Sequence, residues 1–171
     1  GPYVMGVDFG KQEDYTVAIV QDLKGNIVDW YRNNAQDWNT MLRDVADLAR
    51  KYNANVMCEV NGIGDPLFDQ LRKLYNNVQP FITSNKSKQE IVEGLILDFN
   101  ENSIGLPNRN DFDALWSELE VFTYDYNPKT RSIRYGHPSG MHDDTVISLS
   151  ISNYNRKQNQ AGRYVVMGNY R

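Results

Sequence analysis

Two acidic residues interrupt apolar stretches of this chain, and they constrain its fold more than any other feature. Asp8 lies near the end of the apolar run over residues 3–9, and Glu59 lies inside the short run over residues 55–60. A carboxylate among apolar neighbours is costly unless it is paired or binds a metal ion. If the two runs are neighbouring strands of one sheet, the side chains of Asp8 and Glu59 can converge on a shared partner.

The spacing of apolar residues predicts strands that come first and then alternate with helices. Strands over residues 3–9, 15–21 and 27–31 are separated by short polar turns, which indicates an antiparallel meander. Helical periodicity follows over residues 37–52, 67–74, 87–100 and 112–122, with further strands over 55–60 and 78–82. Asp37 is placed to cap the first helix. This order predicts an α/β domain with a mixed sheet.

The C-terminal part is harder to interpret. Residues 121–135 alternate around Asn127-Pro128-Lys129-Thr130 and predict a β-hairpin. Residues 146–152 fit both the alternation of a strand and the rows of a helix, so the periodicity leaves both open. Residues 156–171 are polar enough to form a partly ordered basic tail.

Charge is distributed unevenly along the chain. The net charge is -4, but residues 1–126 hold 11 Lys/Arg against 20 Asp/Glu, whereas residues 127–171 hold 7 against 2. The C-terminal quarter is therefore a candidate surface for a polyanion, and a basic tail without a partner is the alternative. The candidate DNA contacts are Lys129, Arg131, Arg134, Arg156 and Lys157.

Length and composition favour one intracellular domain. With 171 residues, 40% of them apolar, the chain can build one sizeable core, so we expect a single domain over 1–171. A long apolar run and a secretory leader are both missing from the sequence. Gly1-Pro2 resembles the scar of a removed expression tag, and the lone Cys58 excludes an intramolecular disulfide.

A third source of carboxylates lies near the end of the chain. The Asp143-Asp144 pair could join Asp8 and Glu59, and such an oxygen donor set suits Mg²⁺ or Mn²⁺. Each acid taken singly has a structural alternative as a turn residue, an ion-pair partner or a helix cap. His142 could be a ligand, a proton shuttle or a residue at a helix start, and Asp14 an auxiliary acid or a turn residue.

Three segments occur in an order that resembles a known family. They are Val7-Asp8-Phe9-Gly10 with Asp14-Tyr15 downstream, Cys58-Glu59-Val60-Asn61-Gly62, and His142-Asp143-Asp144. This order resembles the nuclease domains of terminase large subunits from tailed bacteriophages, over about residues 3–155. The resemblance implies an RNase H-like fold, in which a helix follows His142, and catalytic, metal-binding carboxylates at Asp8, Glu59 and one of the last two aspartates, with Asp144 favoured over Asp143.

The same resemblance implies a function. The expected activity is largely sequence-neutral cleavage of double-stranded viral DNA during genome packaging in the host cytoplasm, which leaves 5′-phosphate and 3′-hydroxyl ends. Two Mg²⁺ or Mn²⁺ ions would serve the hydrolysis, with Asp8 bridging them. The implied partners are DNA, a packaging ATPase domain, the portal protein and the small terminase subunit. The chain contains no segment resembling that ATPase, so we do not expect it to translocate DNA alone.

Rival functions share parts of this pattern. A RuvC-like junction resolvase or a transposase would place the same acids on the same fold, so only substrate preference separates them from a terminase. An actin-like ATPase starts with a similar strand but needs a second half and a Gly-rich loop, which these 171 residues do not contain. A nonenzymatic docking module would use the acids structurally, and it would not be stabilised by Mn²⁺.

Overall fold

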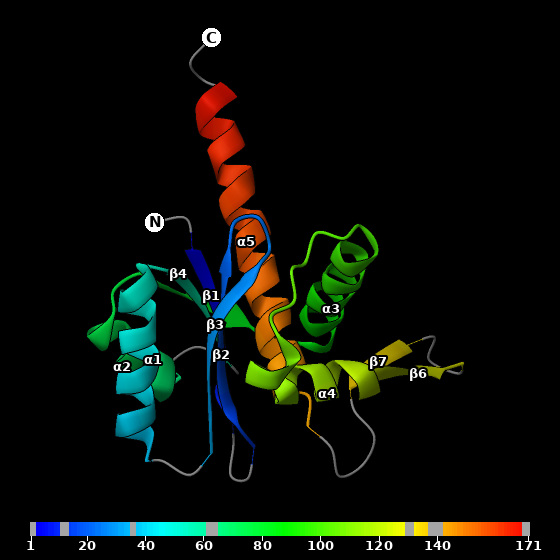
Figure 1. The fold of residues 1–171 in the computed structure, drawn as a ribbon, viewed down its shortest axis with the longest axis horizontal. Coiled ribbons are helices and arrows are strands. Elements are labelled where there is room, and N and C mark those ends of the chain that lie inside the picture. Colours follow the sequence, from blue (N-terminus) through cyan, green and yellow to red (C-terminus); the bar gives the residue numbers. More distant parts are fainter. Residues whose placement is uncertain are drawn as a thin grey trace.

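A computed structural model describes residues 3–10, 14–34, 37–60, 65–128, 132–136 and 142–168. Its centre is a five-stranded sheet with the order β3-β2-β1-β4-β5 (Figure 1). The strands are β1 (Tyr3–Asp8), β2 (Thr16–Asp22), β3 (Ile27–Asn33), β4 (Asn55–Val60) and β5 (Val78–Ile82). The first three pair antiparallel, and β1, β4 and β5 pair parallel. The predicted mixed sheet is therefore confirmed.

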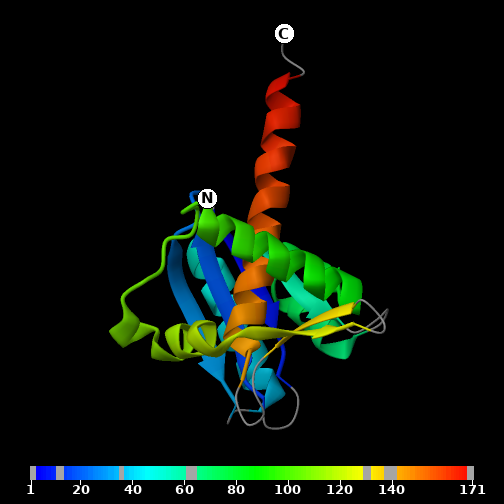
Figure 2. The same ribbon diagram turned by 90° about the vertical axis from the view of Figure 1, so that its right-hand side faces the viewer.

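Helices cover both faces of this sheet. One face carries α1 (Trp38–Tyr52) and α2 (Pro66–Leu74), and the other carries α3 (Asn85–Asn100), α4 (Asp113–Val121) and α5 (Asp144–Gly168) (Figures 1 and 2). A short 3-10 turn, η1 (Arg109–Asp111), precedes α4, and the predicted hairpin is formed by β6 (Thr123–Asn127) and β7 (Ser132–Gly136). Among the described residues, none of these helices is long and apolar enough to cross a membrane.

Alternation along β1 and β4 decides which way the acidic side chains face. Val7 and Cys58 are adjacent in the parallel register, and both are buried in the core beneath α1 and α2. Met57 instead packs with apolar residues of α3 and α5. Successive side chains of a strand point to opposite faces of the sheet. Asp8 and Glu59 therefore lie on the face that α5 covers, at the carboxyl ends of two parallel strands.

Helix α5 crosses the sheet at very short distance because residue 6 has no side chain. A Cβ atom at Gly6 would lie 2.3 Å from the carbonyl oxygen of Ser148 and 2.3 Å from the backbone nitrogen of Ser152. The hydroxyl of Ser148 donates to the Gly6 carbonyl at 3.0 Å, and the amide of Asn155 donates to the Met5 carbonyl at 3.4 Å. These contacts hold α5 against the middle of β1.

The structure also resolves the segments that the sequence left open. Residues 146–152 are helical, as the resemblance implied and as the helical rows allowed. The helix continues to Gly168, while the last residues of the predicted partly ordered tail over 156–171 lie outside the described residues. Part of this extension is explained by contacts, since Arg156 is buried against α3. The Asp37 cap is confirmed by its hydrogen bonds from the backbone amides of Asn39 and Thr40.

Candidate metal centre

Asp8 and Glu59 meet at the carboxyl edge of the sheet. Because Val7 pairs with Cys58 in the parallel register, the two acids are the next residues along neighbouring strands. Their side chains are close neighbours, so the charge of Glu59 acts on Asp8. Burial raises the pKa of Asp8 well above its usual value, and the neighbouring Glu59 raises it further, with smaller contributions from Asp144 and Asp143.

Asp144 reaches the same region from the first residue of α5. Its side chain is 12% exposed, and its Oδ2 accepts a hydrogen bond from the backbone N–H of Tyr15 at 3.0 Å. Burial raises the pKa of Asp144 to about 6, although the Tyr15 N–H acts in the opposite direction; Asp14, Glu118 and Asp143 add to the increase. The site thus concentrates negative charge that the protein does not neutralise well.

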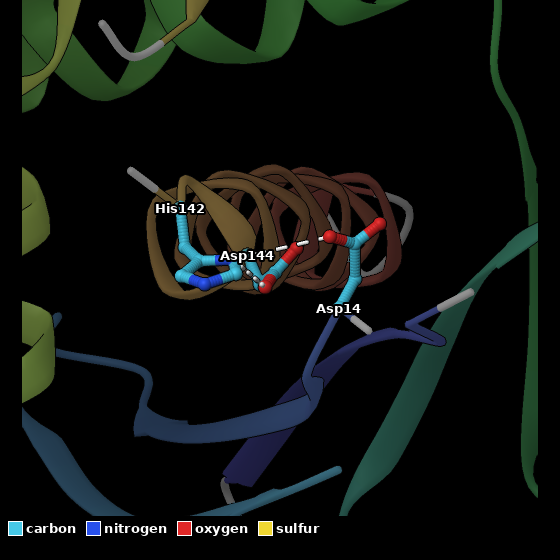
Figure 3. Close-up of side chains that lie close together, drawn as sticks. All are labelled: Asp14, His142 and Asp144. Carbon is cyan, nitrogen blue, oxygen red and sulfur yellow. Dashed lines mark ion pairs between the residues drawn. The ribbon is translucent and has the colours of Figure 1, made fainter. Parts of the chain in front are cut away.

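Asp14, His142 and Asp144 form the tightest group of possible ligands. Among the described residues, they are the one set of three acidic, histidine or cysteine side chains whose ligand atoms all lie within 4.8 Å of one another. Nδ1 of His142 lies 3.6 Å from Asp144 Oδ2 and 3.8 Å from Asp14 Oδ1 (Figure 3). The structure therefore brings both predicted auxiliary residues to Asp144. Asp8 and Glu59 do not belong to this tight group.

The two adjacent aspartates face different neighbours. The backbone carbonyl of Asp143 accepts from the Ile147 N–H at 2.9 Å, so Asp143 stands at the cap position of α5. Its Oδ2 lies 3.5 Å from Nζ of Lys88 on α3. The carboxylate of Asp144 instead faces Tyr15 and His142. Asp143 thus has a cationic partner, and Asp144 lies among other acids.

The predicted DNA contacts are placed in different surroundings. Lys129 and Arg131 lie outside the described residues, and Arg134 is on β7, opposite Asp125. Arg156 is only 5% exposed, and its guanidinium lies 3.0 Å from Asp98 Oδ2. Lys157 is 40% exposed in its side chain and also pairs with Asp98, at 2.7 Å. Burial leaves Arg156 no surface to offer to a phosphate, so we do not carry it forward as a DNA contact.

Sequence reasoning missed Glu118, which lies directly beside the site. This residue of α4 is 6% exposed, and its Oε2 accepts from the Thr145 backbone N–H at 2.8 Å. A signal was present, because Glu118 lies three residues after Leu115 and beside Leu119, on the apolar face of its helix. A charged residue in that position indicates a buried polar partner.

The donor set fits a hard divalent cation. Among the residues that the structure describes, no lysine or arginine forms an ion pair with Asp8, Glu59 or Asp144. Carboxylate oxygens are the ligands that Mg²⁺ and Mn²⁺ prefer, and a bound cation would offset the burial and the mutual repulsion that raise the pKa values of Asp8 and Asp144. The arrangement can therefore hold a metal ion through carboxylates from β1, β4 and α5.

A meander extended by two parallel strands, with acids at the carboxyl edge, is the RNase H-like fold. The chain belongs to the terminase RNaseH-like domain family, whose model matches residues 5–152. It is 29% identical over 153 residues to the terminase large subunit of Thermus virus P23-45, a match that covers 88% of this chain and 31% of that protein. The chain thus spans about a third of the length of the curated relatives it matches.

Solved structures agree with this assignment. The large terminase nuclease from thermophilic phage G20c superposes with a TM-score of 0.79 at 26% identity, covering 89% of this chain and 81% of that one. A crystal structure of the same nuclease with bound magnesium gives a TM-score of 0.79 at 27% identity, over 89% of this chain and 80% of that one. The RNase H-like fold and the family, both implied by the sequence, are therefore confirmed.

Proposed function

We propose that this chain is a metal-dependent endonuclease that cleaves double-stranded viral DNA during genome packaging. The observation that carries this proposal is that Asp8 and Glu59 lie at the ends of neighbouring strands, on the face that α5 covers, while Asp144 is the first residue of α5 and its charge acts on Asp8. Among the described residues, none of the three forms an ion pair with lysine or arginine. Its family and the similarity to a nuclease solved with bound magnesium support the same function.

In this proposal Asp8, Glu59 and Asp144 would hold two Mg²⁺ or Mn²⁺ ions, with Asp8 as a ligand of both. When bound, the ions lower the pKa of the attacking water and stabilise the departing 3′ oxygen. Asp144 is preferred to Asp143 as the ligand because Asp143 already lies beside Lys88. The Tyr15 N–H orients Asp144 through Oδ2, so that Oδ1 can turn to a cation. His142 and Asp14 border Asp144 as auxiliary groups.

The proposed DNA-facing surface is the β6–β7 hairpin with Lys129, Arg131 and Arg134, together with Lys157. Support comes from the position of the hairpin base: a Cβ at Gly136, the last residue of β7, would lie 3.8 Å from Asp143 Oδ2. Phosphate contacts fix position without reading bases, so cutting should be largely sequence-neutral. Changing the three hairpin cations to Ala should weaken DNA binding and flatten its salt dependence; unchanged affinity would exclude the hairpin as the contact.

The remaining parts of the proposal concern the larger assembly. The curated relatives are terminase large subunits about three times as long as this chain, so we propose that the domain works beside a packaging ATPase, the portal protein and the small subunit in the host cytoplasm. A junction resolvase of the same fold would cut four-way junctions in preference to duplex DNA. Comparing the two substrates in one assay separates these functions.

The test is cleavage of supercoiled plasmid with Mn²⁺, Mg²⁺ or EDTA. Wild-type chain should nick and linearise the plasmid with Mn²⁺ or Mg²⁺, and Asp8→Asn should lose this activity while keeping its fold. Asp69→Asn is the matched control because it removes the same charge from an exposed position on α2. Cleavage that persists in Asp8→Asn would overturn the proposed site, and no cleavage with either metal would favour the docking module.

A further inference from the structure

Glu118 ties α4 to the residue that follows Asp144. Its Oε2 accepts from the Thr145 N–H at 2.8 Å and from the Thr145 hydroxyl at 2.5 Å. A further negative charge close to the acidic site would by itself destabilise the fold, and Glu118 contributes to the raised pKa of Asp144. Its place beside the site therefore needs a reason, and the two hydrogen bonds to the first turn of α5 supply one.

Arg32 of β3 connects the same glutamate to the other side of Asp144. Its Nη2 lies 3.6 Å from Glu118 Oε1, and its guanidinium lies over the Tyr15 ring, 3.3 Å from the ring centre. The backbone of Tyr15 in turn donates to Asp144 Oδ2. These contacts form a closed ring that includes the Asp144 carboxylate. Its members are Glu118, Thr145, Asp144, Tyr15 and Arg32.

The surroundings show that polar contacts maintain this ring. Arg32, Glu118 and His142 line a cavity of about 330 Å³, together with Asp113, Ala114, Ser117 and Val121 of α4. Because this side of the ring borders open space, close packing alone does not fix Arg32 and Glu118. The hydrogen bonds from Thr145 to Glu118, the ion pair of Glu118 with Arg32 and the contact of Arg32 with the Tyr15 ring therefore help to hold α4, β3 and α5 together at the edge of this cavity.

We propose that Glu118 and Arg32 are positioning residues, which hold the first turn of α5 so that Asp144 is oriented for a metal ion. This inference rests on the metal site of the proposed function. Removing a group that orients a metal-ligating side chain commonly lowers metal affinity or activity by about 10–100-fold. The same size of effect is expected here, without any direct contact between Glu118 and the ion.

The sharpest test compares two variants of Thr145 by calorimetric titration of Mn²⁺ into the metal-free chain. Thr145→Val keeps the shape but removes the hydroxyl that donates to Glu118. We expect it to bind Mn²⁺ about 10-fold more weakly. Thr145→Ser keeps the hydroxyl and should bind within about twofold of wild type. Glu118→Ala should weaken binding at least as much as Thr145→Val.

The variant Asn155→Ala is the control that distinguishes a loss of helix stability from a loss of Asp144 positioning. Asn155 donates to the carbonyls of Met5 in the middle of β1 and Asn55 at the start of β4, so its loss should destabilise the packing of α5 at a place outside the acidic group. Lower melting temperature with unchanged Mn²⁺ affinity is expected for this control. If Thr145→Val behaves in the same way, the inference is overturned, even if Glu118→Ala does not fold. If wild type binds no Mn²⁺, the metal site and the inference both fail; if it binds Mn²⁺ but cuts no DNA, only the function fails.

Discussion

Helix α5 borders buried acidic groups in two regions, and the charges that surround the acidic group differ between these two regions. In its middle, Asp98 of α3 is 2% exposed and is met by Arg156 at 3.0 Å, Lys157 at 2.7 Å and the Asn153 amide at 2.7 Å. At its first residue, Asp144 lies near Asp14, Glu118 and Asp143, and its pKa is raised to about 6.

The region around Asp98 is a structural ion-pair cluster, whereas the region around Asp144 has the properties of a ligand site. In the cluster around Asp98, residues of the chain itself supply the opposite charges, and the cluster joins α3 to α5. The acids around Asp144 repel one another, and they lower the stability of the metal-free fold in return for affinity for a cation. Perturbed acids gathered in this way are a common mark of functional sites.

The largest effect that would sharpen this comparison is expected at Asp98. Asp98→Asn leaves the buried guanidinium of Arg156 without a full negative charge, which should lower the free energy of unfolding by about 3–5 kcal/mol. Chemical denaturation measures the change. Glu101→Gln, at an exposed position just after α3, is the control and should change little. A stable Asp98→Asn variant would show that the two regions do not differ as described.

A smaller effect is expected when metal is added to the other region. At a free Mn²⁺ concentration about 100 times the Kd, a ligand that binds only the folded chain adds about 2.7 kcal/mol of stability. Thermal melting should show this rise in wild type and lose it in Asp8→Asn. An equal rise in both proteins would place the metal elsewhere.

The smallest effect concerns Asp144 in the absence of metal. A carboxyl whose folded pKa is raised contributes stability below its unfolded pKa near 3.8 and loses that contribution as pH rises through about 6. Asp144→Asn is neutral at every pH, so in EDTA at pH 7.5 it should be more stable than wild type, on the order of 1 kcal/mol after solvent screening. At pH 4 the gain should nearly vanish. A loss of stability at pH 7.5 would contradict the described repulsion.

The sheet and the placement of the acids on it could be predicted from the sequence because local patterns encode them. Short apolar runs predicted β1 and β4, and a charged residue inside each run is costly enough to mark Asp8 and Glu59. The fold follows from the order of these elements. Whether Asp8, Glu59 and Asp144 bind metal stays a prediction that the proposed titrations address.

The partners of the basic residues could not be predicted, because they depend on contacts between distant segments. Arg156 and Lys157 contribute to the positive charge of the C-terminal quarter, but both pair with Asp98, more than fifty residues earlier. Glu118 and Thr145 are likewise 27 positions apart. Net charge along a sequence therefore overstates the charge that a folded surface presents.

Glycine at position 6 sets how closely α5 can approach the strand that carries Asp8. A single methyl group there would meet the backbone of α5 at Ser148 and Ser152, so the helix would have to retreat from the sheet. Asp144 lies one turn before Ser148 on α5, and Asp8 lies two residues after Gly6 on β1. The distance between Asp8 and Asp144 therefore depends on the absence of a Cβ atom at Gly6, a residue that takes no part in the chemistry.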